Sequence, residues 1–514
     1  MARACVLLTS EDAYPYQQRG VSRWCDVLTK ELAEIDFVLL AVTTHPYLAT
    51  QYRLSNNIRE MITVPVGGTQ DPAEYGDHES FVDYLRRCWS MAAEDVEKDY
   101  LPAYERLLQE VTSPSQPPRK LGLTLLQLHQ HLRHYDYYRT QMHPAVWETF
   151  VAITVRAWRS VYALEPSPSI AELVEAWRLL HRLLLPLAIE VPKVDLTHSS
   201  AAAFCGLPCI MAKLRRQTPY LLTEHGVHLR DQYLASTSAS PFVRWFFLRL
   251  VNTMVDVNYA FADQISPVCQ YNMRWETWRG VEPGRLRLIY NGVDPDQFRP
   301  AARTDHGRPT VVNLGGIGPL KGQLDLIEAA ALVRRNMPDV QFRLCGSPAD
   351  NTYFVHCQEL VRALGLQDTV VFPGKVIDPA SVLQQADVVA LASLSEAFPY
   401  TIIEAMLTEA AIVATDVGGV SEALGDSGLL VHPRDPVAMA EAIDSLLRCP
   451  EDRRHLGQRA RQRALFGFTT LRFADAYRWS YQHLMAPDGA VPDRTEPTFP
   501  IEPDTEPALA IAES

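Results

Sequence analysis

The stretch that decides the fold is Glu396-Ala397-Phe398-Pro399-Tyr400-Thr401-Ile402-Ile403-Glu404. It follows an apolar run, Val388–Leu391, that predicts a buried parallel strand, and it opens a helical pattern near Thr401. Backbone N–H groups at such a helix start bind anions and suit a diphosphate. Two glutamates eight residues apart, one in a loop and one in a helix, can accept hydrogen bonds from hydroxyl groups at two places on one ligand. Taken alone, each glutamate is better explained as a helix cap or a solvated residue.

Around this stretch the sequence alternates between short apolar runs and helix-length segments. The alternation predicts a parallel α/β domain over residues 286–469. Its expected strands are Leu286–Tyr290, Thr310–Leu314, Gln341–Cys345, Val370–Phe372, Val388–Leu391, Ile412–Thr415 and Gly428–Val431. Its expected helices include Gln323–Arg335, Asn351–Leu364 and Glu404–Glu409.

The first half, residues 1–285, shows a similar alternation that a helical stretch interrupts. Ala4–Leu8 and Phe37–Val42 predict buried strands and Val21–Leu32 a helix, which is a doubly wound opening. Strand-like runs return at Tyr220–Thr223 and Gln264–Val268. Between about 81 and 190 helical periodicity predominates, so we expect a helical insertion that shapes either an acceptor site or a partner surface. Its expected helices are Val96–Val111, Leu123–His131, Val146–Tyr162 and Ile170–Leu185.

The sequence therefore predicts two Rossmann-like domains whose sheets face a cleft, where open α/β folds bind ligands. An aromatic-rich helix, residues 470–486, is expected to cross back to the first domain. Residues 487–514 are acidic and proline-rich, which predicts disorder.

Composition narrows the class of protein. The formal net charge of −13 argues against a nucleic-acid partner, because phosphate backbones need a basic surface. The nine cysteines form no C-x-x-C pair and read as reduced thiols. The short run Ala4–Leu8 is no signal-peptide core, and no run approaches the roughly 20 apolar residues of a membrane helix. We therefore expect a cytoplasmic protein, associated with the inner face of the membrane only through partners.

The second half resembles glycosyltransferase family 4, a family with the two-domain GT-B fold. Glu396-x7-Glu404, followed by Val413 to Glu422 with its Asp416-Val417-Gly418-Gly419 run, is similar to the donor-binding signature. Ile289-Tyr290-Asn291-Gly292-Val293-Asp294 resembles the linker between the domains, and Leu314 to Gly322 the first phosphate-binding loop.

The first half resembles the Pel exopolysaccharide glycosyltransferase group, including its helical insertion. The resemblance is carried by short motifs that extend it to about residue 485: Tyr14-Pro15-Tyr16, Gly20-Val21-Ser22 with Trp24, Arg133-His134-Tyr135-Asp136-Tyr137, Leu185-Pro186 and Leu222-Thr223-Glu224-His225-Gly226.

The resemblance implies roles for individual residues. Lys321 matches the lysine that neutralises the donor diphosphate, and Glu404 the residue that holds the ribose hydroxyls. Glu396 matches the glutamate near the transferred sugar. The remaining expected contacts are the amides of Tyr400 and Thr401 for the diphosphate, Val376 near the base, and the glycine loop Gly20-Val21 for a close backbone approach.

Two first-domain residues are further candidates. His225 aligns with the active-site histidine of the family, at the carboxyl end of an expected strand, although a lone histidine there is more often structural. Arg230 has two equal interpretations: a cation for the donor phosphates, or an ion-pair partner of Asp231.

One position departs from the family pattern. Gly316 stands where the phosphate loop usually carries an arginine that shares the diphosphate with the lysine. Losing one preorganised donor costs about 3 kcal/mol of transition-state stabilisation. Either another cation, such as Arg230 or Arg23, compensates, or activity is reduced or redirected.

The resemblance implies a retaining hexosyltransferase that uses a UDP-sugar, UDP-glucose being favoured, and a growing polysaccharide or other glycan acceptor. Its catalytic residues would be His225, Glu396 and Lys321. No cofactor and no metal is expected, since no Asp-x-Asp motif is suitably placed and Lys321 with a helix start would replace the ion.

The sequence allows three other functions to be considered, and it argues against two of them. The first is a catalytically weakened sugar-nucleotide-binding or scaffold subunit of a membrane-bound polysaccharide export assembly, which Gly316 in the phosphate loop favours. A GT-B epimerase or phosphorylase would need other active-site groups. A dinucleotide-binding oxidoreductase would need G-x-G-x-x-G after the first strand, where Thr9-Ser10-Glu11-Asp12 stands instead.

Overall fold

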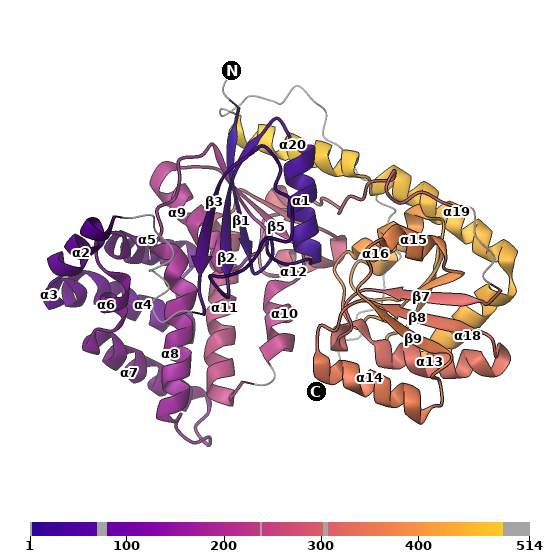
Figure 1. The fold of residues 1–514 in the computed structure, drawn as a ribbon. Coiled ribbons are helices and arrows are strands. Elements are labelled where there is room, and N and C mark those ends of the chain that lie inside the picture. Colours follow the sequence, from indigo (N-terminus) through magenta and orange to yellow (C-terminus); the bar gives the residue numbers. More distant parts are fainter. Residues whose placement is uncertain (1–2, 69–79, 237–238, 302–306, 487–514) are drawn as a thin grey trace.

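A computed structural model describes residues 3–68, 80–236, 239–301 and 307–486. It contains two parallel six-stranded sheets, one in each half of the chain, standing side by side (Figure 1). The first sheet has the order β3-β2-β1-β4-β5-β6. Its strands are β1 Cys5–Glu11, β2 Asp36–Thr43, β3 Ile58–Pro65, β4 Leu196–Ser199, β5 Tyr220–Glu224 and β6 Gln264–Pro267.

The second sheet repeats this order, because β12-β11-β10-β7-β8-β9 is the same arrangement counted from β7. Its strands are β7 Thr310–Leu314, β8 Gln341–Cys345, β9 Val370–Gly374, β10 Val388–Leu391, β11 Ala411–Thr415 and β12 Leu429–Val431. Both sheets thus have the doubly wound topology whose ligand sites lie beyond the carboxyl ends of the strands. The predicted fold class is confirmed.

Helices cover both faces of each sheet. In the first half they are α1 Gly20–Glu31, α9 Leu207–Arg216, α10 His228–Ala235, α11 Pro241–Phe261 and α12 Gln270–Trp278, besides the inserted helices. In the second half they are α13 Gln323–Asn336, α14 Asn351–Ala363, α15 Pro379–Gln384, α16 Tyr400–Leu407, α17 Val420–Leu424, α18 Pro436–Arg448, α19 Pro450–Gly467 and α20 Thr470–Met485. Short 3-10 turns lie at Leu185–Leu187, Phe204–Gly206, Pro283–Arg285 and Pro319–Lys321.

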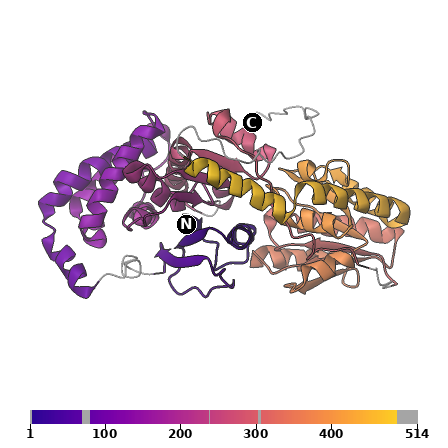
Figure 2. The same ribbon diagram turned by 90° about the horizontal axis from the view of Figure 1, so that it is seen from above.

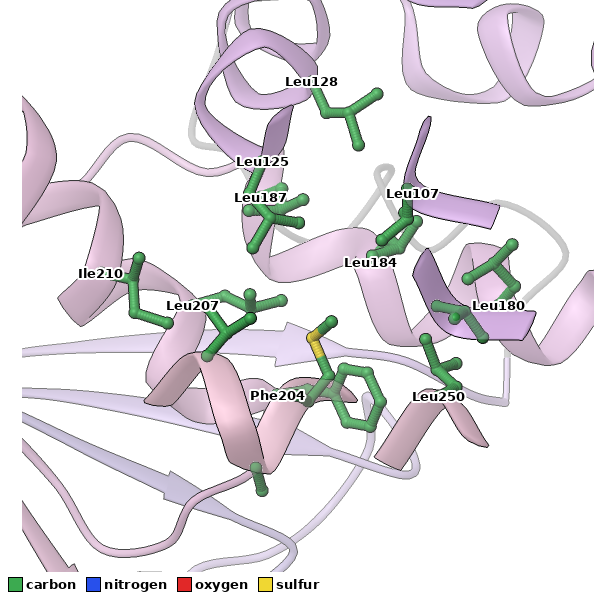
Figure 3. Packing of buried hydrophobic residues seen from close by; sticks show 14 of the residues in the cluster. Leu107, Leu125, Leu128, Leu180, Leu184, Leu187, Phe204, Leu207, Ile210 and Leu250 are labelled. Atoms are coloured by element: carbon green, nitrogen blue, oxygen red, sulfur yellow. The ribbon is translucent and has the colours of Figure 1, made fainter. Parts of the chain in front are cut away.

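The helical insertion lies on the side of the first sheet that is remote from the second domain (Figures 1 and 2). Leucines from its helices meet Phe204, the first turn of α9 and Leu250 of α11 in one continuous apolar core (Figure 3). Burial of these side chains is the main force that fixes the insertion to the domain. Its helices are α2 Phe81–Ser90, α3 Ala93–Asp95, a π-helical turn Val96–Tyr100, α4 Leu101–Thr112, α5 Pro118–His134, α6 Tyr137–Gln141, α7 Pro144–Val161 and α8 Ile170–Leu184.

Helix α20 leaves the second domain and packs against the first (Figure 2). Phe473, Tyr477 and Tyr481 lie in the same buried cluster as Trp24 of α1. The Tyr477 hydroxyl shares a 3.0 Å hydrogen bond with Thr223, and that of Tyr481 a 2.8 Å bond with His198. The end of the chain is therefore anchored by aromatic burial together with polar contacts to β4 and β5.

One expected strand is not formed, and two strands, β3 and β4, were not predicted. Leu286–Tyr290 is no strand of either sheet: it runs beside β6 with one isolated bridge, from Ile265 to Leu286, and then leads into the second domain. The edge strand β3 was not predicted, because Arg59 and Glu60 break its apolar pattern. The predicted disordered tail, residues 487–514, lies outside the described residues. Across the described residues, no helix is both long and apolar enough to cross a membrane.

Candidate functional site

Lys321 and Glu396 meet at the carboxyl edge of the second sheet. Lys321 Nζ lies 2.5 Å from Glu396 Oε1, and Ser393 Oγ donates to the same oxygen at 2.8 Å. A backbone bond of 2.8 Å from Leu394 N–H to the Leu320 carbonyl joins the two loops. The Glu396 side chain is 9% exposed and that of Lys321 is 39% exposed. The carboxylate is thus held in place, while the ammonium group keeps an open side for an incoming anion.

Two glycines allow these loops to approach each other. Gly418 has φ +59°, and a Cβ there would stand 1.7 Å from the Glu396 carbonyl oxygen. Gly322 has φ +62°, and a Cβ there would stand 2.0 Å from the Ala392 carbonyl oxygen. Both positions require a left-handed backbone and no side chain, which explains why glycine occurs there. Gly418 and Gly322 therefore allow the loop that carries Glu396 and the loop that carries Lys321 to pack closely.

Helix α16 begins directly after the Glu396 loop. Tyr400 and Thr401 form its first turn, and Pro399 at the N-cap has no side-chain acceptor to offer the amides. Thr401 Oγ1 donates to the Leu314 carbonyl at 3.3 Å, which places this turn against the end of β7. The start of the helix dipole thus faces the same edge as Lys321, as an anion site requires.

Glu404 lies one turn further along α16, 4% exposed, and forms an ion pair with Arg23 of α1. The Arg23 guanidinium lies 4.8 Å from the centre of the Tyr400 ring and 5.5 Å from that of Phe298. This pair joins the two domains. The carboxylate expected to hold ribose hydroxyls therefore has a cationic partner from the first domain.

The glycine loop of the first domain faces α16. Gly20 opens α1, and a Cβ there would lie 3.8 Å from Tyr400 Cδ2, an ordinary contact distance. No contact within the described chain therefore forbids a side chain at Gly20. Val21 is half-buried and packs against the cluster around Trp24.

His225 follows β5 and lies edge-on to Trp24, with ring centres 4.8 Å apart. Its Nε2 atom is buried and has no hydrogen-bond partner among the described residues. Burial lowers the pKa of His225 to about 3, so the imidazole is neutral at physiological pH. A neutral ring can orient a hydroxyl group, but it supplies no charge for a phosphate.

The structure does not bring Arg230 or Val376 into contact with the other candidates, as far as the described residues show. Arg230 lies on α10 beside Asp231. Burial raises the pKa of Asp231 to about 6, and the positive charge of Arg230 opposes this rise. Val376 is half-buried between β9 and α15.

Several site contacts escaped the sequence reasoning. Ser393 was missed, although a hydroxyl three residues before Glu396 is a signal that could have been used. Asn291 Nδ2 donates to the Phe398 carbonyl at 2.8 Å and so ties the domain linker to the Glu396 loop. Trp24 packs edge-on against both His198 and His225, and nothing local in the sequence indicates these two contacts.

Two buried acids interact with each other: Glu224, the residue before His225, and Glu276 of α12. Tyr259 Oη donates to one carboxylate oxygen of Glu224, whereas Glu224 Oε1 and both oxygens of Glu276 have no hydrogen-bond partner among the described residues. Burial raises the pKa of Glu224 to about 7, against the lowering effect of the Tyr259 bond. Burial, and next the charge of Glu224, raise the pKa of Glu276 well above its ordinary value. These carboxyl groups are thus protonated at pH values where a solvated glutamate is ionised.

This pair predicts a pH-dependent stability. The folded protein retains protons that the unfolded chain releases above about pH 4.5, so stability falls as pH rises from there through about 7. Glu276→Gln should therefore have a more favourable effect on stability at pH 8 than at pH 4.5, because only at the higher pH does the unfolded chain release the proton that the buried carboxyl retains. Melting temperatures at both pH values would measure this, with the exposed Glu359→Gln as control. An equal effect at both pH values would contradict the assignment.

Within the described part of the chain, no three histidine, cysteine or acidic side chains are grouped so that they could hold a metal ion.

Comparisons with known proteins agree with this arrangement. Residues 4–284, more than half of the chain, match the family model described as Domain of unknown function (DUF3492), and residues 294–463 match Glycosyl transferases group 1. D-inositol 3-phosphate glycosyltransferase 2 of Catenulispora acidiphila is 34% identical over 229 residues, 40% of this chain. The aligned part spans about half of that relative, 53%.

Solved structures show the same fold. Sucrose-phosphate synthase from Thermosynechococcus elongatus has a TM-score of 0.59 at 21% identity, covering 94% of this chain and 99% of its own. HepE of Anabaena has a TM-score of 0.59 at 16% identity, covering 93% and 100%. The chain therefore belongs to the DUF3492 family, its second half matches the Glycosyl transferases group 1 model, and its fold is that of GT-B glycosyltransferases.

Proposed function

We propose that the chain transfers a hexose from a UDP-sugar to a growing polysaccharide or another glycan, with retention of anomeric configuration and without a metal. The observation that carries this is the grouping at one sheet edge of Lys321, Glu396 and the start of α16, with Glu404 one turn away. A cation, a helix start and two fixed carboxylates provide one partner for each part of a nucleotide sugar.

In this reaction the bond between the sugar C1 and the diphosphate oxygen breaks, and a bond from C1 to the acceptor oxygen forms. The acceptor proton passes to the leaving diphosphate on the same face of the sugar. Lys321 and the α16 amides stabilise the charge that grows on the leaving group, which is the role a metal ion has elsewhere. His225 is neutral, its Nε2 atom has no hydrogen-bond partner in the part of the chain that the structure describes, and it orients a hydroxyl group of the sugar.

UDP-glucose is the first donor to test. HepE, whose fold this chain shares, was solved in complex with UDP-glucose. The polysaccharide acceptor and an association with a membrane-bound export assembly rest on the resemblance of the first half to the Pel group.

The proposal is tested by calorimetric titration with UDP, UDP-glucose, UDP-N-acetylhexosamines and GDP-sugars in the presence of EDTA. We expect selective binding of one UDP-sugar, followed by its turnover when glycan acceptors are added. A binding isotherm that appears only after EDTA is replaced by Mg²⁺ would contradict the metal-independent mechanism. Absence of binding to every nucleotide would favour a scaffold subunit, with Gly316 as the reason for the lost donor.

A further inference from the structure

Arg23 holds an unusual position for a cation. It lies in the first turn of α1, in the first domain, yet its guanidinium is inserted between aromatic rings of the second domain and pairs with Glu404. Its side chain is 27% exposed, and that of Glu404 is 5% exposed. Burial lowers the pKa of Arg23, and Tyr400 is the foremost of the groups that oppose this. A guanidinium this desolvated needs an anionic partner in every state of the protein.

Arg23 is linked to the phosphate loop through the first turn of α16. Arg23 lies over Tyr400, and the next residue, Thr401, bonds to Leu314, from which the chain continues into Gly315 and Gly316. A Cβ at Gly316 would have Ala349 Cβ at 3.6 Å and the Ser347 carbonyl oxygen at 3.8 Å as its nearest neighbours. The loop thus has space for a side chain that it lacks, while a cation from the first domain stands at the neighbouring helix start.

Glu404 has two partners that compete. Its carboxylate pairs with Arg23 in this structure, and under the proposed function it accepts hydrogen bonds from the ribose hydroxyls. When hydroxyl groups bind to the carboxylate, Arg23 loses its ion-pair partner and keeps only the through-space attraction of Asp26 among the acidic groups that act on it. A diphosphate arrives with the same ligand, and guanidinium groups bind phosphate oxygens with two parallel hydrogen bonds.

We propose that Arg23 is an exchangeable donor-binding residue: Glu404 holds it in the ligand-free protein, and it passes to the donor diphosphate once the ribose occupies Glu404. Arg23 then supplies, from the first domain, the cation that the loop at Gly316 does not carry. Because the ion pair spans the two domains, the exchange also couples nucleotide binding to their relative arrangement. The inference rests on the proposed function in assigning the ribose to Glu404.

The test compares two ligands that differ only in phosphate. In Arg23→Ala, uridine should bind about threefold more tightly, because Glu404 is free of its competitor. UDP should bind about tenfold more weakly, because one charge-assisted phosphate contact is lost. Arg23→Lys, which keeps the charge but not the fork or the ring contacts, should shift both affinities in these directions by smaller factors. Arg299→Ala, at an exposed ion pair, should change neither.

A second arm uses the space at Gly316. Gly316→Arg should restore most of the UDP affinity in the Arg23→Ala background and should add less than twofold to the unaltered protein. A purely structural role of Arg23 would weaken uridine and UDP together, and that result, or no change with either ligand, would overturn the exchange alone. If the unaltered protein binds neither ligand, the proposed function fails as well.

Discussion

Lys321→Ala is expected to lower kcat by about 10²–10³-fold, the scale for removing one preorganised group that stabilises charge on a leaving group. The structure explains the size of the effect. The Lys321 ammonium group is exposed on one side, and on the other side it contacts the Glu396 carboxylate, which is almost completely buried. Since negative charge grows on the diphosphate in the transition state, the loss should fall mainly on kcat.

The measurement is a steady-state assay with the donor identified by titration. Lys193→Ala removes an exposed lysine that lies before the amino end of β4, and it should leave kcat within twofold. Lys321→Arg keeps a positive charge and should recover part of the rate. A folded Lys321→Ala variant with unaltered kcat would remove Lys321 from the phosphate site, and a change confined to KM would limit it to ground-state binding.

Much of the second domain could be predicted, because its strands are short, apolar and separated by long amphipathic segments. β7, β8 and β10 have the predicted bounds, Thr310–Leu314, Gln341–Cys345 and Val388–Leu391. β10, which is buried on both faces, is a continuous apolar run, whereas β8 alternates between polar and apolar residues. The edge strand β3 lacks such a run, since Arg59 and Glu60 lie at the exposed rim of the sheet.

The site could be predicted only where its contacts are local. Lys321 and Glu396 were selected from motifs, and the structure places them 2.5 Å apart. The partner of Glu404 was not predicted. Arg23 belongs to a different domain and stands in no motif with Glu404, and its pairing depends on how α1 meets α16. A single sequence contains no signal for such a contact.

Glu404→Ala is the second substitution with a large expected effect, a fall in kcat/KM of about 10²-fold. Two hydrogen bonds from ribose hydroxyls to a charged acceptor are lost, each worth about 1.5–3 kcal/mol, and the freed Arg23 recovers part of this by binding the diphosphate more readily. Nucleotide specificity should weaken too, because ligands that contain a ribose would no longer gain affinity over ligands that lack one. Inorganic pyrophosphate should therefore compete with the donor more effectively in this variant than in the unaltered protein.

Stability separates this effect from simple damage to the site. Glu404→Ala leaves the Arg23 guanidinium between Tyr400 and Phe298 without its anion, so the melting temperature should fall, and added pyrophosphate should restore it. The double variant Arg23→Ala/Glu404→Ala should be more stable than Glu404→Ala alone, because the uncompensated charge is gone. Glu441→Ala, at an exposed position of α18, should alter neither activity nor melting temperature. If the double variant is the less stable of the two, the ion pair is not what Glu404 contributes, and its place in the site has to be sought in packing.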